Sequence, residues 1–479
     1  MSAAHGTHWS TDDILKATRG RPLTPCGARV FTDIAIDSRD IDPDALFVAI
    51  RGTVHDGHGF VADVVAKGVK GFVIEAGRPL DPALSALADK GITVIGVADT
   101  TTALGDLAAY HRRRMPAAVA AITGANGKTT TRAMTAAVLE RHLPTLATPG
   151  NRNNQIGLPL TLLKLKAHHR WAVLELGMNH PGEIRYLGGI AAPDLGLITN
   201  IGPVHLEGLG SIEGVFKAKS ELIETVRSRG WMVLNADDPM TPRLKALCRA
   251  SVFRFGVAPT ADLRADGVVR TADGFDFTLR LPGGDAVPVT LRAVGEFMVA
   301  NAMAAASIAH LAGIPGRTIA EGLQAFSPVS GRMALIHTPG GVHLLDDTYN
   351  ANPTSMNAAL KALRRLSAGG RTFAVLGDML ELGSASADLH RDLGGCAARC
   401  GLTGLFATGR FAEDLARGAR QEKMAPDRIR IGSKAALIRL LEEALAPGDW
   451  VLVKGSRGMR METVVKAVRR RFDGARSVA

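Results

Sequence analysis

The 479-residue sequence has few cysteines and few aromatic residues, and each shortage argues against a class of protein. Its four cysteines are Cys26, Cys248, Cys396 and Cys400. Cys396 and Cys400 have helical spacing, but no second pair completes a zinc site, so we expect reduced thiols. Aromatic residues make up 5% of the chain, and no basic tract is interleaved with aromatic residues that would stack on bases. We therefore expect no nucleic-acid partner.

Long apolar runs are missing as well. No apolar stretch approaches the ~20 residues that span a bilayer, so we expect no integral membrane segment. Residues 1–10 contain no basic segment followed by an apolar one, which argues against a secretory signal and favours a cytoplasmic location. The 46% hydrophobic and 22% charged residues are typical of a folded soluble protein, and the length predicts roughly three domains.

Basic residues outnumber acidic ones, which gives a net charge of +11. Such an excess is typical of proteins that bind nucleic acid and of proteins that bind small anions. Part of it lies in Arg469, Arg470 and Arg471, which is more simply the solvated end of a helix. Because aromatic stacking residues are scarce, we favour small anionic substrates.

A glycine-rich stretch at residues 123–130 lies between an apolar run, residues 117–122, and a helix-like run that extends to Leu143. This order of strand, glycine loop and helix is typical of phosphate binding, because backbone N–H groups face the phosphate oxygens. Ile122 occupies the place of the first glycine of the common pattern, so this is the shorter Gly-x-x-Gly-Lys-Thr form. Its residues are Thr123, Gly124, Ala125, Asn126, Gly127, Lys128, Thr129 and Thr130.

The segment around this loop alternates strands and helices, which predicts a mostly parallel sheet. Further strands are expected at residues 171–176, 195–198 and 231–234. Glu175 ends one of them, and ligands of such sheets gather at the carboxyl ends of the strands. Glu175 is therefore expected near the phosphates, where a carboxylate suits Mg²⁺. A helix cap or a salt bridge is the alternative.

The segments on either side also have α/β patterns. Before residue 112, β-like runs are interrupted by residues 37–39 and by residues 52–60, which suit a phosphate-bearing ligand or are plain turns. After residue 329, strands and helices alternate again, without a glycine loop of their own. A domain of that kind is suited to closing over a neighbouring nucleotide. We expect domains at residues 1–112, 113–328 and 329–479.

Taken together, these motifs resemble the Mur ligase family. The resemblance is carried by residues 37–39, 56–58, 123–130, 153–157, 175–180, 205, 218–221, 332, 347–353, 376–379 and 454–457. It implies an α/β fold with three domains. A central P-loop-type domain with a mostly parallel sheet would bind ATP, between an N-terminal α/β domain for a uridine-diphosphate substrate and a C-terminal Rossmann-like domain for a dipeptide.

The resemblance also implies a reaction. An ATP-dependent ligase would join D-alanyl-D-alanine to UDP-N-acetylmuramoyl-tripeptide through an acyl phosphate, in cytoplasmic peptidoglycan precursor synthesis. Residues 349–353, Tyr-Asn-Ala-Asn-Pro, favour this reaction over addition of the third peptide residue. We expect the enzyme to act as a monomer.

Substrate-binding residues are implied in all three domains. Those beside the uridine diphosphate would be Ser38, Arg39, Asp56, Gly57 and His58. Asn153 and Asn154 lie in an amide-rich loop, which suits a base or a sugar because amides both donate and accept hydrogen bonds. Asn350 and Asn352 would lie by the incoming dipeptide.

The resemblance also implies residues that bind ATP and metal ions. One Mg²⁺ would be held by His205 and by a carbamate that CO₂ forms on Lys219, although composition alone describes these two as an ordinary histidine and a surface lysine. Thr129 and Glu175 would hold another Mg²⁺. Beyond the glycine loop, the implied ATP contacts are Asn301 with adenine, and Arg332 and Asp347 with the phosphates and ribose. The implied catalytic residues are Lys128, His205, Lys219 and Arg332.

Other interpretations stay open. A ligase that adds the third peptide residue, or a folylpolyglutamate synthase-like ligase, would share the fold, although a folate enzyme needs no uridine-diphosphate domain. A nucleotide-binding switch protein would not need the third domain. Two positions depart from the family pattern, Ala125 and the pair at residues 297–298, where Phe-Met replaces the usual His-Asn. The second departure leaves the adenine contacts open, and the sequence does not choose between meso-diaminopimelate and lysine in the tripeptide.

Overall fold

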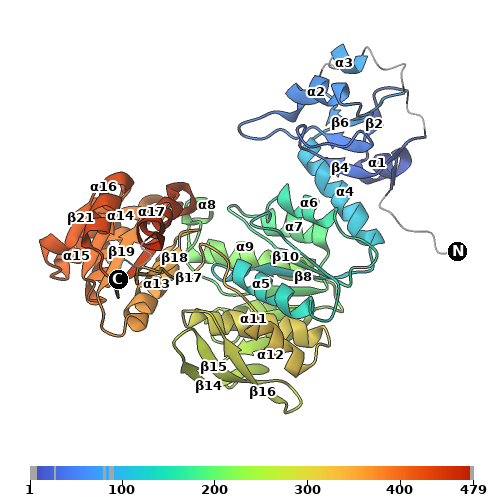
Figure 1. The fold of residues 1–479 in the computed structure, drawn as a ribbon. Coiled ribbons are helices and arrows are strands. Elements are labelled where there is room, and N and C mark those ends of the chain that lie inside the picture. The colour runs from blue at the N-terminus through green and yellow to red at the C-terminus, as the bar shows by residue number, and fades with distance from the viewer. Residues whose placement is uncertain (1–7, 26–27, 79–81, 86–90, 475–479) are drawn as a thin grey trace.

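The computed structural model describes residues 8–25, 28–78, 82–85 and 91–474, so Cys26 lies outside the described residues. Within them the chain forms three α/β units, each built on its own sheet, and Figure 1 shows them as three lobes. This arrangement confirms the prediction of a three-domain α/β fold. The three cysteines that the structure describes, Cys248, Cys396 and Cys400, are free thiols, as expected.

The first unit has a five-stranded sheet in the order β2-β7-β6-β5-β4, parallel except for β2. Its elements are β1 (Trp9–Ser10), α1 (Thr11–Thr18), β2 (Arg21–Pro22), β3 (Val30–Phe31), β4 (Asp33–Ala35), β5 (Ala45–Val48), α2 (Val61–Ala66), β6 (Gly71–Glu75), α3 (Pro82–Ser85), β7 (Thr93–Val97) and α4 (Thr100–Arg114). Strand β3 pairs with β1, while β4 joins the main sheet. Ser10 and Asp13 form a capping box that fixes the start of α1.

The central unit has a nine-stranded sheet in the order β16-β15-β14-β13-β12-β11-β8-β10-β9. Its strands are β8 (Ala118–Thr123), β9 (Thr145–Ala147), β10 (Trp171–Glu175), β11 (Leu195–Ile198), β12 (Trp231–Asn235), β13 (Ser251–Gly256), β14 (Leu263–Arg270), β15 (Phe275–Arg280) and β16 (Ala286–Leu291). Its helices are α5 (Lys128–Leu139), α6 (Gly157–Leu162), α7 (Glu183–Ala191), α8 (Leu206–Leu209), α9 (Ile212–Thr225), α10 (Thr241–Leu247), α11 (Phe297–Leu311) and α12 (Gly316–Gln324). Only the pairs β14–β15 and β15–β16 are antiparallel.

Both faces of the central sheet are buried, which explains the continuous apolar runs of its strands. Successive residues of β8 enter different clusters: Ala120 and Ile122 belong to the core that contains α5 and α11, and Val119 and Ala121 belong to the core that contains α7 and α9. The strand is therefore held from two sides, and the loop after it starts from a fixed point. Helix α5 ends at Leu139 rather than at Leu143.

The third unit has a six-stranded sheet in the order β17-β18-β22-β19-β20-β21, parallel except for the pair β17–β18. Its elements are β17 (Ala334–His337), β18 (His343–Asp347), α13 (Pro353–Leu366), β19 (Thr372–Leu376), α14 (Ser386–Arg399), β20 (Gly404–Ala407), α15 (Ala412–Gln421), β21 (Ile429–Ile431), α16 (Lys434–Ala444), β22 (Trp450–Lys454) and α17 (Glu462–Asp473). Figure 1 shows this lobe beside the central one.

Helix α4 joins the first two units, because it packs against α1 on one side and against α6 and α7 on the other. In the described part of the chain, no helix combines the length and the apolar character that crossing a bilayer requires.

Candidate active site

The glycine loop connects the end of β8 to the start of α5, as the sequence predicted. Glycine is required at two positions of the loop, because neighbouring atoms leave no room for a Cβ atom there. Gly124 has φ +143°, and a Cβ atom there would lie 1.9 Å from Oγ1 of Thr199. Gly127 has φ +85°, and a Cβ atom there would lie 2.2 Å from Oδ1 of Asn301. The loop is thus pressed against its neighbours, and the backbone N–H groups at the start of α5 form a site suited to an anion.

Asn126 is the residue through which the loop is tied to the rest of the site. Its backbone N–H donates to Oδ1 of Asn200 at 3.0 Å, and its carbonyl accepts from Oγ1 of Thr199 at 2.6 Å. On its other side, Oδ1 of Asn126 accepts from Nδ2 of Asn352 at 2.7 Å. Asn352 also caps α13, where it accepts from the N–H of Ser355. One direct hydrogen bond therefore joins the phosphate loop to the third unit.

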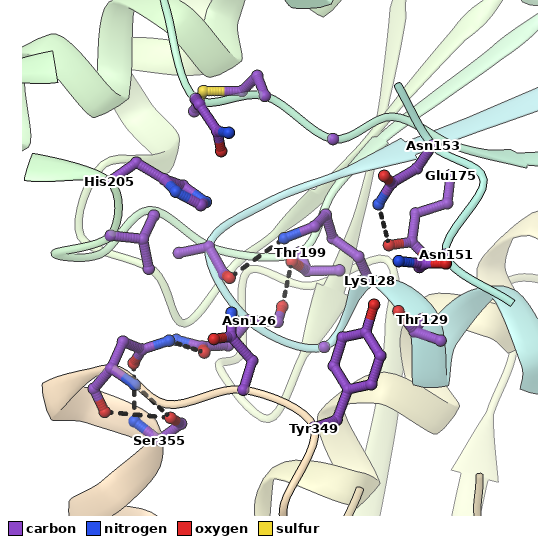
Figure 2. Close-up of a pocket in the computed structure, with 18 of the residues that line it drawn as sticks. Asn126, Lys128, Thr129, Asn151, Asn153, Glu175, Thr199, His205, Tyr349 and Ser355 are labelled. Atoms are coloured by element: carbon purple, nitrogen blue, oxygen red, sulfur yellow. Dashed lines mark hydrogen bonds between the residues drawn. The ribbon is translucent and has the colours of Figure 1, made fainter. Parts of the chain in front are cut away.

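Three polar atoms beside the loop are buried without any hydrogen-bond partner: Oγ1 of Thr129, Nε of Arg132 and Oε2 of Glu175. Oε2 of Glu175 lies 3.6 Å from Nε of Arg132, while Oε1 accepts from Nδ2 of Asn153 at 2.8 Å. Unsatisfied buried polar atoms are costly, so a cluster of them indicates a ligand site. Figure 2 shows Thr129, Glu175 and Asn153 close to Lys128 in the same cavity.

This cluster fits a Mg²⁺ ion. Two of its atoms, a hydroxyl and a carboxylate oxygen, are the ligands that Mg²⁺ prefers. Among the described residues, no group of three or more His, Cys, Asp or Glu side chains could hold a metal by itself. Mg²⁺ usually takes one or two side chains and completes its shell with water and substrate phosphates.

Two lysines lie near the phosphate loop: Lys128 is half-buried and Lys219 is buried. Nζ of Lys128 donates to the carbonyl of Gly124 at 2.8 Å, and burial lowers its pKa although Glu175 opposes that shift. Lys219, on α9, is 1% exposed rather than on the surface. Burial first, and then the charge of Lys128, hold the pKa of Lys219 well below its ordinary value. Burial and the neighbouring positive charge both disfavour the protonated form of this amine.

The third unit contributes a group of charged side chains that surround one tyrosine. The guanidinium of Arg332 lies 4.0 Å from the ring centroid of Tyr349. Asp347 is held on both carboxylate oxygens: Oδ1 accepts from the N–H of Met333 at 3.1 Å, and Oδ2 pairs with Nζ of Lys454 at 2.6 Å. Figure 2 shows Tyr349 reaching from this unit toward Thr129.

All three units line a single cavity of about 1150 Å³. The residues assigned to the site from the sequence that line it are Ala125, Asn126, Gly127, Lys128, Thr129, Thr130, Asn153, Asn154, Glu175, His205, Lys219, Asn301, Arg332, Asp347, Asn350 and Asn352. Thr123 and Gly124 lie just behind the lining, where Oγ1 of Thr123 donates to the carbonyl of Leu176. From the first unit, Arg51, Gly52, Thr53 and Thr101 reach the cavity.

The residues expected to bind uridine diphosphate do not line this cavity; they are Ser38, Arg39, Asp56, Gly57 and His58. They form two local clusters. Arg39 pairs with Asp37 at 2.7 Å, and this hydrogen bond holds the pKa of Asp37 well below its ordinary value. Burial alone would raise the pKa of Asp56, but hydrogen bonds from His58 and Arg78 lower it to about 2.

The side chains at the site that were not assigned a role from the sequence include Arg132, Tyr349, Glu381 and Lys454. Arg132 is four residues after Lys128 on the same helix, and a positive charge in that buried position was the only local signal. Tyr349 belongs to a motif that the resemblance used, but no role was given to its ring. Glu381 lies 2.5 Å from Nδ1 of His205 although the two are 176 residues apart, so no local pattern could have found it.

The fold and the site define an enzyme class in which a phosphate-loop domain shares one cavity with two further α/β domains. Three family models match successive parts of the chain: "Mur ligase family, catalytic domain" at residues 30–112, "Mur ligase middle domain" at residues 122–309, and "Mur ligase, glutamate ligase domain" at residues 331–457. The chain belongs to the Mur ligase family.

Comparisons with known proteins agree over nearly the whole chain. It is 36% identical to the UDP-N-acetylmuramoyl-tripeptide–D-alanyl-D-alanine ligase of Escherichia coli K12, over 92% of this chain and 95% of that protein. A crystal structure of MurF from Acinetobacter baumannii is similar with a TM-score of 0.87 at 33% identity, covering 97% of this chain and 99% of that one. The MurF ligase from Thermotoga maritima in complex with ADP has a TM-score of 0.81 at 25% identity, covering 92% and 98%.

Proposed function

We propose that this chain is the ATP-dependent ligase that joins D-alanyl-D-alanine to UDP-N-acetylmuramoyl-tripeptide in peptidoglycan precursor synthesis. The observation that carries the proposal is the single cavity of about 1150 Å³ that all three units line around the phosphate loop. An enzyme that holds a nucleotide, an acid and an amine together needs such a cavity. The relatives that carry this activity in their names match the chain from end to end, which favours it over the alternatives.

The phosphates of ATP would lie against the backbone N–H groups of the loop at the start of α5. Lys128 already lies over the loop, where it donates to the carbonyls of Gly124 and Ala125. Arg332 lies within the electrostatic reach of Lys128 and Arg132 across the domain boundary. Together these cations would offset the charge that spreads over the transferred phosphoryl group. ADP in the Thermotoga maritima structure supports an adenine nucleotide at this site.

Thr129 and Glu175 would hold one Mg²⁺, and His205 together with a carbamate on Lys219 would hold a second. Bound there, the ions would supply positive charge next to the phosphates. Asn153 would keep Glu175 in position through the hydrogen bond to Oε1. Asn301 packs beneath Gly127, and its oxygen accepts from Oγ1 of Thr131, so it would support the loop as well as any adenine contact.

The burial of Lys219 supports the carbamate. A neutral amine adds to CO₂, so that a C–N bond forms, one proton leaves to solvent and an anion results. The buried amine beside Lys128 thereby becomes a carboxylate-like anion, which suits a metal ion. The low pKa of Lys219 supports this chemistry, because a protonated amine would not react.

In the proposed reaction, the tripeptide carboxylate attacks the γ-phosphorus, ADP leaves and an acyl phosphate forms. The free amine of D-alanyl-D-alanine then attacks the acyl carbon, phosphate leaves and the amide remains. Residues of the third unit, including Asn350 and Tyr349, would position the dipeptide while that unit covers the cavity and excludes water. Excluding water matters because an acyl phosphate hydrolyses readily.

The clusters around Arg39 and His58 would bind the uridine diphosphate of the second substrate, at the far end of the first unit. Arg51 and Thr53 reach from this unit to the cavity, and they would contact the part of that substrate that extends inward. Because one chain supplies all three walls, we propose a monomer as the active unit. ATP and nucleotide-linked precursors belong to the cytoplasm, where we place the reaction.

Phosphate release tests the proposal. It is measured with UDP-N-acetylmuramoyl-tripeptide and D-alanyl-D-alanine added singly and together, with the amide product followed by mass spectrometry. We expect turnover only when both are present. Hydrolysis of ATP that ignores both substrates would contradict the ligase and favour a nucleotide switch.

A further inference from the structure

The third unit touches the central unit at His205, through a contact that the reaction scheme above leaves unused. Oε2 of Glu381 lies 2.5 Å from Nδ1 of His205, and the carbonyl of Glu381 accepts from the backbone N–H of Glu207 at 3.1 Å. Both His205, with φ +51°, and Glu381, with φ +64°, have a left-handed backbone that is uncommon outside glycine. The surrounding structure must therefore hold both residues in place.

The loop that carries Glu381 is fixed by hydrogen bonds from three sides. The carboxylate of Asp378 accepts from the backbone N–H groups of Arg410 and Phe411. The N–H of Met379 donates to Nε2 of His390 at 2.9 Å, and the N–H of Leu380 donates to Oγ of Ser456 at 2.9 Å. Glu381 is thus presented from a rigid support, although its side chain is half exposed.

The segment that carries His205 is fixed as well, and it connects to the phosphate loop. Asn200, five residues before His205, binds both the N–H and the carbonyl of Asn126 through its side-chain amide. Asn126 in turn accepts from Asn352 of the third unit. Two contacts from the third unit, at Asn126 and at His205, therefore meet two segments of the central unit that the side chain of Asn200 joins by hydrogen bonds.

We propose that Glu381 is a positioning residue that orients His205 when the third unit is docked. The carboxylate accepts a hydrogen bond from the N–H at Nδ1, which leaves Nε2 without a proton and with a free lone pair. His205 lines the cavity. A ligating histidine is commonly oriented in this way by a carboxylate on its other nitrogen. The inference rests on the proposed function, in which His205 serves a Mg²⁺ ion. Beyond that function, we infer that His205 takes the orientation of a metal ligand only when the third unit is docked on the central unit.

The first test needs neither metal nor substrate. Imidazole ¹⁵N spectra of the metal-free protein, recorded at about pH 9 where imidazoles are neutral, report which nitrogen bears the proton. The His205 signals are assigned by their loss in His205→Asn. We expect Nδ1 to carry the proton in the wild type and a substantial share to move to Nε2 in Glu381→Ala. Unchanged signals in that variant would overturn the proposal.

Glu207→Gln is the matched control. Glu207 lies on the adjoining helix α8 with an exposed side chain, and it makes no ion pair among the described residues. Its substitution removes the same charge near His205 without removing the contact, so the His205 signals should keep the wild-type pattern. A shift as large as that of Glu381→Ala would show that charge alone, rather than contact, sets the tautomer, and would count against the proposal.

The second test measures the Mg²⁺ concentration that gives half-maximal turnover. We expect it to rise about 10-fold or more in Glu381→Ala, with kcat near the wild-type value at saturating Mg²⁺. Glu381→Gln keeps an acceptor oxygen and should fall between the two. An unchanged Mg²⁺ requirement in both variants would overturn the role. If the wild-type protein does not join D-alanyl-D-alanine to the tripeptide, the proposed function fails. The metal-free spectra still decide whether Glu381 orients His205.

Discussion

The phosphate loop and the polar clusters of the first unit are both assigned to nucleotides, yet they are built in opposite ways. Beside the loop, Thr129 and Glu175 are buried, and each keeps one oxygen without a hydrogen-bond partner, although that oxygen of Glu175 lies 3.6 Å from Nε of Arg132. In the first unit, Arg39 is exposed and its charge is already satisfied by Asp37. The site beside the phosphate loop is preorganised and leaves hydrogen-bonding atoms for a ligand to satisfy. In the cluster of the first unit, Arg39 already has a charged partner within the protein.

This difference has an energetic consequence. A buried, unpaired oxygen gains a partner when a ligand binds and gives up little hydration at that moment, so its interaction with the ligand is strong. An exposed ion pair must first separate before it can bind a phosphate, and such a pair contributes little. Substitutions at the loop should therefore change turnover greatly, and substitutions in the first unit should change mainly substrate affinity.

The largest effect is expected for Lys128→Ala. Removing this charge should reduce turnover by about 10³-fold, because Lys128 would stabilise the transferring phosphoryl group. Phosphate release with both substrates measures it, and calorimetry should show that the uridine-diphosphate substrate still binds. Lys217→Ala, which removes an exposed lysine of α9, is the control and should resemble the wild type. Turnover of Lys128→Ala near the wild-type rate would mean that the phosphate loop takes no part in the reaction.

The next effect is expected for Lys219→Ala, which should lose about 10²-fold in turnover because the carbamate anion is gone. Short carboxylic acids such as formate or acetate should restore part of the rate by entering the vacated space. The same acids should do nothing for Lys128→Ala, which keeps Lys219. Full activity without added acid, or no recovery with it, would argue against a carbamate.

A smaller effect is expected for Asn153→Ala, since the side-chain hydrogen bond of Asn153 goes to Glu175 and not to the phosphate loop. The Mg²⁺ concentration for half-maximal turnover should rise about 10-fold, and excess Mg²⁺ should recover the rate. Asn154 is its counterpart in the same loop, where its oxygen accepts from the N–H groups of Ile156 and Gly157. Asn154→Ala should instead lower the free energy of unfolding by about 1 kcal/mol, seen as a lower Tm. Equal Mg²⁺ requirements in the two variants would contradict the prediction that Asn153 affects Mg²⁺ binding and Asn154 affects stability.

The smallest effect is expected for Arg39→Ala in the exposed cluster. The KM for the uridine-diphosphate substrate should rise about 5-fold with kcat unchanged, because an exposed charge is worth only ~1 kcal/mol. The pKa of Asp37 should return upward toward its ordinary value once its partner is removed. Titration by NMR and steady-state kinetics measure the two changes. A fall in kcat as large as that of Lys128→Ala would mean that the two sites do not differ as described.

The phosphate loop could be predicted well because its signals are local. A buried strand, two glycines with forced backbone angles and the start of a helix all lie within residues 118–139, and β8 and α5 fall where they were expected. The antiparallel strands β14, β15 and β16 were not predicted. They extend an edge of the sheet with alternating burial, a weaker signal than the continuous apolar runs of the buried parallel strands.

The sequence could not predict which individual polar residues are buried. Lys219 lies in a helix whose neighbours Lys217 and Ser220 are polar, so its position among surface residues was the natural expectation. The structure buries it because α9 packs against α7 and the central sheet on that face. Conversely, Arg39 and His58 had the residue types of a binding site, but they lie away from the central cavity.

By itself the sequence determined the buried strand before the glycine loop, the loop, the helix after it and the polar residues at strand ends, because these depend on backbone geometry over a few neighbouring residues. Only the tertiary structure decided which side chains complete one another. Asn153 meets Glu175 across 22 residues, His205 meets Glu381 across 176, and Asn126 meets Asn352 across 226. A hydrogen bond needs its two atoms within about 3 Å, and for residues so far apart in the chain that distance is set by how the sheets and domains pack.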